Sequence, residues 1–240
     1  MKIYSIICTR SPKLKLVTQK LASKLSSLPS KVMLMTNQES IFSGYKKAFD
    51  KINPDDKDIF ILCHDDISID NTPEEMKKAL SIVNAEGYGF AGIAGTKLLG
   101  KDAVWWHQER WKKGHHSGHV FHLNKETNTV YPTSYGPLSK VVVLDGVFLA
   151  ASAKTLREIG LEKPDYLKGN WDFYDLHYTM SAFKKGLTNI TVNIKIAHLS
   201  AGELVGRDGW EENRQAFIKE HALPAQIEGI TESRESDTIL

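Results

Sequence analysis

The chain has 240 residues, of which 41% are hydrophobic and 25% are charged, a composition typical of soluble globular proteins with a sizeable core. Its 31 Lys and Arg against 29 Asp and Glu give a formal charge of +2, which excludes a general attraction to nucleic acid or to anionic membranes. The two cysteines lie in apolar runs, so we expect buried free thiols. The N-terminal apolar run is too short for a signal sequence or a membrane span, so we expect a cytoplasmic protein, free or at the inner face of the membrane, without a transmembrane segment.

The first hundred residues alternate between two patterns. Strands rich in β-branched residues are predicted over 2–8, 31–37, 58–66 and 89–97, and helices over 14–28, 40–52 and 72–86. This alternation predicts a mostly parallel sheet flanked by helices. Ligands bind such sheets beyond the carboxyl ends of the strands, where Arg10, Asn37, Asp65 and Asp66 would fall.

Residues 100–140 show no clear period, and we expect a long functional loop there, rich in aromatic residues and histidine. It carries Trp105, Trp106 and Trp111, which a linker would rarely contain. The spacing of its histidines, at 107, 115, 116, 119 and 122, fits no tetrahedral zinc pattern, which favours a polar loop over a zinc site.

Regular elements return after residue 140. Residues 140–152 predict a strand, a turn at Asp145 and Gly146, and a second strand, followed by a strand over 188–200 and helices over 153–160, 173–186 and 209–222. The Asp-Gly pair has two interpretations: a tight hairpin turn, or a place where a ligand approaches the backbone closely.

Asp65 and Asp66 end an apolar strand with two adjacent carboxylates, which repel each other unless a positive charge lies beside them. Oxygen ligands at such a place suit Mg²⁺ or Mn²⁺, and the alternative is a solvated turn. His198, at the end of a later strand, is either a metal ligand or a hydrogen-bonded core residue. Asp175, with Asp172 at the start of a helix, is either a helix-capping acid or a general base.

The ordered set of segments resembles the GT-A glycosyltransferases of family 2 type, in particular the small group that looks like the streptomycin-biosynthesis StrF domain. The segments are SIICTRSP, TNQESIFSGYKKAFD, DIFILCHDDISI, GFAGIAG, VVVLDGVFLAAS, GNWDFYDLHYTMSAFKKGL and IAHLSAGE. The resemblance implies an α/β GT-A fold, Rossmann-like, with a mixed, mostly parallel sheet. It also implies one catalytic domain over 1–225, with a nucleotide-sugar-binding half over 1–99 and an acceptor-side half over 100–225, and a flexible tail over 226–240.

The resemblance also implies roles for residues. Asp66 and His198 would bind Mn²⁺ or Mg²⁺, and Asp175 would be the catalytic base of an inverting single displacement. The donor, a UDP-, GDP- or dTDP-linked sugar, would contact Thr9, Arg10, Asn37, Asp65, Asp66, Asp145 and Gly146. Trp105, Trp106, Trp111 and Tyr174 would bind the acceptor, a glycan, lipid-linked, small-molecule or nucleic-acid hydroxyl.

The chain departs from the family pattern at Tyr174-Asp175, where two acids are usual, and at His177, where a further acid is frequent. The expected activity is that of a hexosyl- or pentosyltransferase, by the resemblance. Two alternatives remain: a non-catalytic sugar- or nucleic-acid-binding module on a degenerate GT-A fold, and a sugar nucleotidyltransferase. The second would need a glycine-rich phosphate loop after the first strand, where CTRSPKLK has no glycine.

Overall fold

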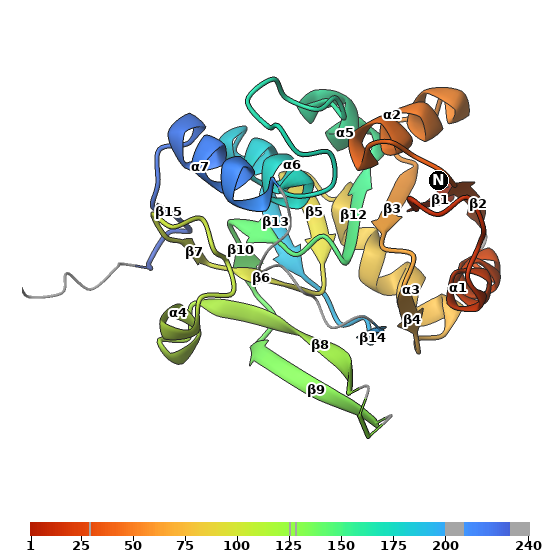
Figure 1. Cartoon of the computed structure of the whole chain (residues 1–240), viewed down its shortest axis with the longest axis horizontal. Helices are drawn as coiled ribbons and strands as arrows, with labels where there is room; N and C mark the ends of the chain where they lie inside the picture. Colours follow the sequence, from red (N-terminus) through yellow and green to blue (C-terminus); the bar gives the residue numbers. More distant parts are fainter. Residues whose placement is uncertain (29, 125, 128, 200–208, 231–240) are drawn as a thin grey trace, which may run out of the picture.

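The computed structural model describes residues 1–240 except 29, 125, 128, 200–208 and 231–240, and is built on two sheets (Figure 1). The larger sheet has the order β10-β13-β5-β12-β3-β1-β2. Its strands are β1 (Ile3–Cys8), β2 (Ser30–Met35), β3 (Ile59–Cys63), β5 (Tyr88–Gly92), β10 (Lys140–Val141), β12 (Phe148–Ser152) and β13 (Thr188–Thr191). β2, β1 and β3 are parallel, whereas β12 runs antiparallel between β3 and β5.

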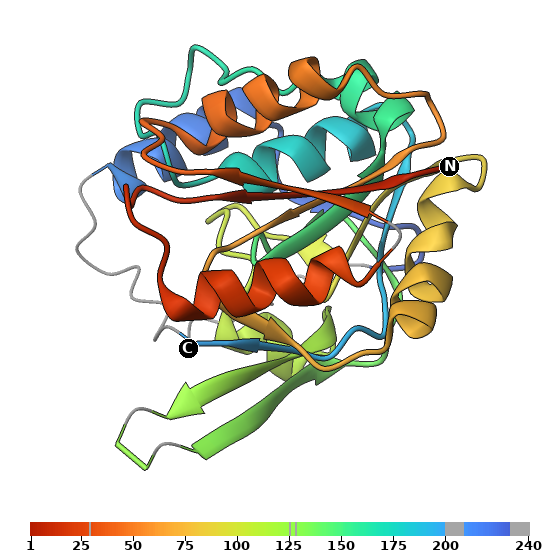
Figure 2. The ribbon, with the colours of Figure 1, turned by 90° about the vertical axis from the view of Figure 1, so that its right-hand side faces the viewer.

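Helices cover both faces of the larger sheet. α2 (Ile41–Ile52), α6 (Tyr174–Lys184) and α7 (Trp210–Glu220) lie on one face and α1 (Leu16–Ser26) on the other (Figure 2). The remaining helices are α3 (Pro73–Leu80), the 3-10 helix η1 (Ser81–Asn84), α4 (Gln108–Lys112) and α5 (Ala153–Ile159). Every residue of β1 and β3 is buried, as expected for central strands covered on both faces.

The second sheet lies below the first in Figure 1 and has the order β11-β6-β8-β14-β4, with β9 paired to β8. Its strands are β4 (Ile67–Ile69), β6 (Ala94–Thr96), β8 (His116–Asn124), β9 (Thr129–Gly136), β11 (Val143–Leu144) and β14 (Ile196–His198). Successive pairs of strands, β3 and β4, β5 and β6, β11 and β12, and β13 and β14, therefore leave one sheet and join the other within a few residues. β10 and β11 cross in the same way. We call the region of these five crossings the seam.

Two sequence interpretations are wrong. Residues 100–140 are not one long loop, because they contain α4 and the β8–β9 hairpin, which projects from the body (Figures 1 and 2). Its strands pair over seven register positions, so cross-strand hydrogen bonds organise a segment whose own sequence has no clear period. Asp145 and Gly146 do not turn a hairpin, because β11 pairs with β6 whereas β12 pairs with β3 and β5.

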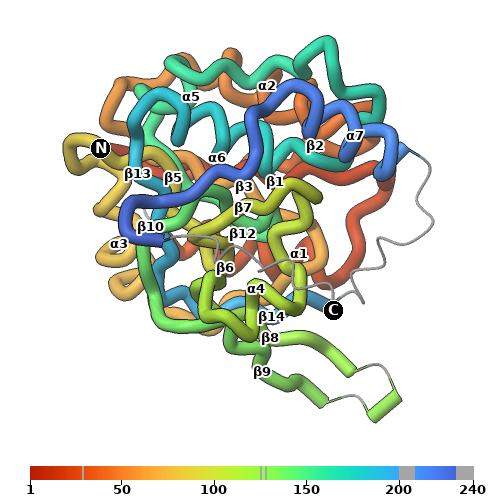
Figure 3. The backbone as a smooth tube through the Cα atoms, turned by 90° about the vertical axis from the view of Figure 1, so that its left-hand side faces the viewer, coloured from red at the N-terminus to blue at the C-terminus, as the bar shows by residue number. Residues whose placement is uncertain are grey.

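The described residues near the C-terminus, including those after residue 225, contact the rest of the chain. β15 (Ala225–Gln226) pairs with β7 (Leu98–Leu99), and the Ile227 N–H donates to Lys97 O at 3.1 Å, where the chain runs back from α7 (Figure 3). Of the expected tail, residues 231–240 lie outside the described residues, as do residues 200–203 of the IAHLSAGE segment.

Both cysteines are buried and unlinked, as expected. Among the described residues, no helix combines the length and the apolar character that crossing a lipid bilayer requires.

Candidate active site

A cavity of about 830 Å³ lies beside the β3–β4 and β11–β12 crossings of the seam, a size that suits a small-molecule ligand. It is lined by twelve of the thirteen residues to which the sequence assigned a site role: Thr9, Arg10, Asp65, Asp66, Trp105, Trp106, Trp111, Asp145, Gly146, Tyr174, Asp175 and His198. The thirteenth, Asn37, is exposed and is not among the lining residues, and its backbone N–H donates to Ser11 O. The cavity thus draws on both halves of the chain.

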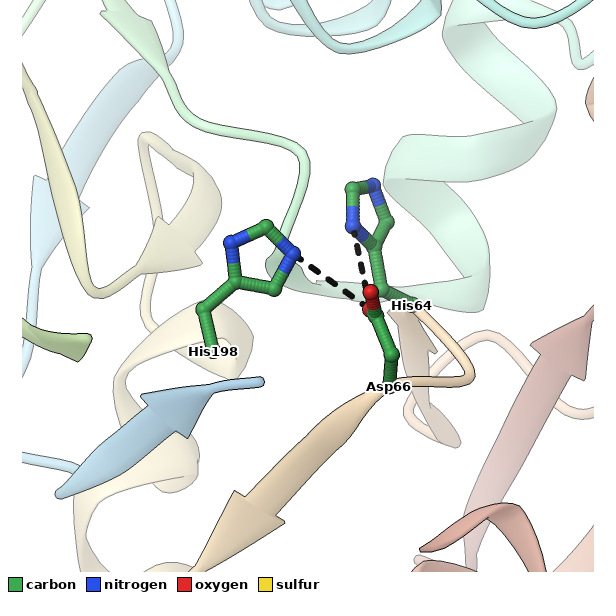
Figure 4. Close-up of side chains that lie close together, drawn as sticks. All are labelled: His64, Asp66 and His198. Carbon is green, nitrogen blue, oxygen red and sulfur yellow. Dashed lines mark ion pairs between the residues drawn. The ribbon is translucent and has the colours of Figure 1, made fainter. Parts of the chain in front are cut away.

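Three side chains at the exits of β3 and β14 form a candidate cation site, shown in Figure 4. Asp66 Oδ1 lies 3.3 Å from His198 Nε2 and 3.8 Å from His64 Nδ1. One ligand atom from each of the three residues lies within 4.8 Å of the others. Burial and the neighbouring His198 lower the pKa of His64, which favours the neutral form that can bind a metal.

The spacing and chemistry of this cluster fit a divalent transition metal. Around an ion with bonds of about 2.1 Å, ligand atoms lie roughly 3 to 4 Å apart, close to the distances between these three side chains. Two imidazoles with one carboxylate suit Mn²⁺ or a softer ion better than Mg²⁺, which prefers oxygen ligands. Asp65 lines the same cavity but is not part of the cluster.

Asp175 lies in the first turn of α6 and lines the cavity. Its Oδ2 accepts a hydrogen bond of 2.9 Å from the Gly146 N–H. Burial, and then the charge of nearby Asp145, raise the pKa of Asp175 to about 7, against the opposing effect of that hydrogen bond. A carboxyl with such a pKa can exchange a proton near neutral pH, which a plain capping residue has no need to do.

The backbone that presents Asp175 is held in an unusual conformation. Phe173, the residue at the start of α6, has φ +64°, which is rare for a large side chain. Its ring packs 5.6 Å from those of Trp210 and Phe217 on α7, measured between centroids. The contacts of Phe173 with α7 thus hold the start of α6, where Tyr174 and Asp175 lie, in place.

Aromatic side chains from residues 100–136 and from α7 form one wall of the cavity. Trp105 is buried, with its ring 5.8 Å from Trp106 and 5.2 Å from Tyr135, so it closes the core beneath the wall. Trp111 is 37% exposed and packs 5.3 Å from Tyr135. Trp105 therefore helps to close the core, whereas Trp111 has a ring face exposed to a ligand.

Arg10 follows the end of β1 and also lines the cavity. Its guanidinium carbon is 4.6 Å from the centroid of the Trp171 ring, and the Trp171 indole N–H donates to Glu39 O at 2.9 Å. This cation–π contact fixes a positive charge on the lining of the cavity.

Sequence reasoning missed His64 as a member of the cation cluster. His64 and Asp66 lie two residues apart at the β3–β4 crossing and both belong to the cluster, whereas Asp65 between them lines the same cavity outside the cluster. The signal available in the sequence was that His64 lies directly beside the two carboxylates in HDD.

Comparison with known proteins places the chain in a family. Residues 22–221 match the model of the family described as "Glycosyltransferase like family". The chain belongs to this glycosyltransferase family. The match covers the cation cluster, Gly146 and Asp175, and it confirms the family resemblance.

Solved structures similar to this chain include a crystal structure of GalNAc-T7 with UDP, GalNAc and Mn²⁺. It has 10% identity and a TM-score of 0.50, and the alignment covers 83% of this chain and 44% of that one, so this chain spans less than half of the length of that protein. A197 from STIV aligns with 10% identity and a TM-score of 0.48, over 82% of this chain and 85% of that one. The likeness to GalNAc-T7 confirms the GT-A fold. A search among curated protein sequences finds no match.

The raised pKa of Asp175 predicts a stabilising substitution. Because folding raises the pKa from 3.8 to about 7, the folded state disfavours the charged carboxylate, and this cost is complete above pH 7 and disappears as the pH falls to 4. We expect Asp175→Asn to raise the free energy of unfolding at pH 8 by about 1–3 kcal/mol, a value reduced for partial exposure to solvent, and by much less at pH 4.5.

The measurement is urea unfolding of both proteins in a metal-free buffer. Asp50→Asn, which changes a carboxylate that is 55% exposed, is the matched control and should shift stability little at either pH. A gain of equal size at pH 8 and pH 4.5 would contradict the raised pKa.

Proposed function

We propose that this glycosyltransferase uses a bound Mn²⁺ to transfer a sugar, a hexose or a pentose, from a nucleotide-sugar donor to an acceptor hydroxyl, with inversion and with Asp175 as the base. One observation carries the proposal: a single cavity holds both the His64, Asp66 and His198 cluster and a carboxyl group with a pKa of about 7. Cleavage of a sugar–phosphate bond needs positive charge at the leaving group and a proton acceptor at the nucleophile, and the cavity offers candidates for both.

On the donor side, His64, Asp66 and His198 would hold the cation. When bound, the Mn²⁺ supplies a Lewis acid that offsets the negative charge developing on the diphosphate. Arg10, fixed over Trp171 on the lining, adds a second positive charge. UDP and Mn²⁺ accompany GalNAc-T7 in its crystal structure, which supports UDP as the first nucleotide to test and Mn²⁺ as the first metal.

On the acceptor side, Asp175 would remove the proton from the attacking hydroxyl. Its Oδ2 accepts the Gly146 N–H bond, which holds the carboxylate in place at the cavity. Its pKa of about 7 makes the group half ionised at neutral pH, close to the optimum for general base catalysis. Attack on the anomeric carbon from the face opposite the leaving diphosphate inverts the configuration.

The aromatic wall is the proposed acceptor surface. Trp111 offers the exposed ring face, and the Trp111 indole N–H donates to Ser134 O, which anchors the ring to β9. A pyranose ring stacks well on such a surface because its C–H face is apolar. The nature of the acceptor beyond a hydroxyl-bearing molecule stays a prediction.

Binding of donor and metal is testable by thermal unfolding. We expect the Tm to rise with one of UDP, GDP or dTDP, or with a sugar conjugate of it, only when Mn²⁺ is present. A ligand at a hundred times its Kd adds about 2.7 kcal/mol, and a domain of this size then shifts by several degrees. The shift should disappear in Asp66→Asn and persist in the exposed control Asp50→Asn. A shift that needs no metal would contradict the metal-dependent donor site.

Turnover is testable separately from binding. Asp175→Asn should lower kcat by about 10²–10⁴-fold while the Kd of the donor changes little, because the amide keeps an acceptor for the Gly146 N–H but cannot take a proton. The proton NMR coupling constant of the anomeric hydrogen in the product reports the configuration, and retention would contradict the inverting route. A wild-type protein that binds donor with Mn²⁺ but turns over no donor would be a binding module instead.

The acceptor surface predicts a selective effect on one substrate. Trp111→Ala should raise the KM for a sugar acceptor by roughly tenfold, the loss of one stacked aromatic contact, and leave the KM for the donor unchanged. Tyr131→Ala is the matched control, since Tyr131 is a 48% exposed aromatic residue of β9 that does not line the cavity. Equal effects of the two substitutions on the acceptor would contradict the assignment of Trp111.

A further inference from the structure

Tyr174 lies where two acids are usual in the family, and its hydroxyl is buried inside the site. The residue is 3% exposed. Its Oη lies 2.7 Å from Gly146 O and 3.0 Å from His64 Nε2. The sequence predicted an acceptor contact for Tyr174, but both hydrogen bonds of its hydroxyl are to the protein itself.

The chemistry of the three groups fixes the direction of both bonds. A carbonyl oxygen can only accept, so the single hydroxyl proton of Tyr174 is donated to Gly146 O. Toward His64 the hydroxyl can then only accept, so Nε2 of His64 must carry a hydrogen. In the neutral ring the lone pair is therefore on Nδ1, the atom that faces Asp66.

We propose that Tyr174 is a positioning residue that holds His64 in the tautomer whose Nδ1 lone pair binds the cation. The inference rests on the proposed function, because it assumes that the His64, Asp66 and His198 cluster takes a metal. Histidines that bind metals are commonly oriented by a hydrogen bond at their other nitrogen, and loss of such a bond weakens metal binding about 10–100-fold. Here a tyrosine hydroxyl from α6 provides that bond.

The same contact links the metal ligand to the base. Tyr174 Oη donates to the carbonyl of Gly146, and the neighbouring Asp175 accepts from the N–H of the same residue. A side chain at position 146 would overlap the Tyr174 hydroxyl, and its Cβ would lie 2.9 Å from Asp175 Cβ, so only glycine fits. One residue of the seam thus holds both Tyr174, which orients His64, and Asp175.

A purely structural role for Tyr174 is the alternative. Its ring packs edge-on against Phe42, Tyr45 and Tyr178, with centroids 6.0 to 6.4 Å apart. Tyr174→Phe keeps this ring and removes only the hydroxyl. Tyr178→Phe is a matched control, because Tyr178 is a fully buried tyrosine of the same helix whose hydroxyl also donates to a carbonyl, that of Leu161 at 2.9 Å.

The experiment measures Mn²⁺ binding directly, by the electron paramagnetic resonance signal of free Mn²⁺, in wild type, Tyr174→Phe and Tyr178→Phe. We expect the Kd for Mn²⁺ to rise at least tenfold in Tyr174→Phe and less than twofold in Tyr178→Phe. Equal Kd values for wild type and Tyr174→Phe would overturn the inference and leave the proposed metal site standing. Absence of Mn²⁺ binding in wild type would overturn both.

A second measurement reads the tautomer of His64 directly and can already be made on the wild-type protein. In metal-free protein labelled with ¹⁵N-histidine, the nitrogen shifts of His64, assigned by comparison with His64→Gln, should show a protonated Nε2 and an unprotonated Nδ1. In Tyr174→Phe these shifts should move toward the mixture of tautomers of a free imidazole, and in Tyr178→Phe they should not. A His64 protonated on Nδ1 in the wild type would overturn the inference even if Tyr174→Phe failed to fold.

Discussion

The backbone at the seam carries the constraint on which the site depends. Where a strand leaves one sheet and joins the other, its N–H and C=O groups lose their ladder partners and need new ones. Some of these partners lie at other crossings and some in neighbouring segments: the His64 N–H donates to Val147 O, the Asp145 N–H donates to Ala94 O at the start of β6, and Asp66 O accepts from the Leu199 N–H just after β14. At Gly146 the partners are side chains, those of Tyr174 and Asp175. The side chains of Tyr174 and Asp175 are therefore held at the seam by backbone groups of Gly146 that need partners, and both side chains line the cavity.

The carboxylate of Asp175 lowers the stability of the folded chain and at the same time provides a group suited to proton transfer. Satisfying the Gly146 N–H with a carboxylate brings a negative charge into a buried place beside Asp145, and burial raises the pKa of Asp175 to about 7. A neutral amide could make the same hydrogen bond without that penalty. The carboxylate is thus a poor choice for stability and a good one for proton transfer, which is the pattern expected where selection for function opposes selection for stability.

The sequence predicted the features that depend on local pattern and missed those that depend on pairing between distant segments. The buried strands β1 and β3, the alternation of strands and helices, and the position of Asp175 in the first turn of α6 follow from hydrophobic runs and helix-start preferences, which act over a few residues. The place of the β8–β9 hairpin in the second sheet depends on the pairing of β8 with β14, and the sheet crossing at Asp145 depends on the pairing of β11 with β6, both between segments far apart in the sequence. His64 had a local indication in its place beside the two carboxylates of HDD, but the role of Tyr174 needs its contact with a residue 110 positions away.

The cation cluster lies across the division at residue 99 that the sequence suggested between a donor half and an acceptor half. His64 and Asp66 come from the β3–β4 crossing in the first half, whereas His198 ends β14 in the second, where β14 pairs with β4. Metal binding to these three ligands would join the two halves at the seam and add to the stability of the folded chain, because an ion that binds only the folded state shifts the folding equilibrium toward it. The two halves are therefore better regarded as two walls of one site. Its centre is the group of crossings that positions both the cluster and Asp175, so a change at one crossing should affect donor and acceptor chemistry together.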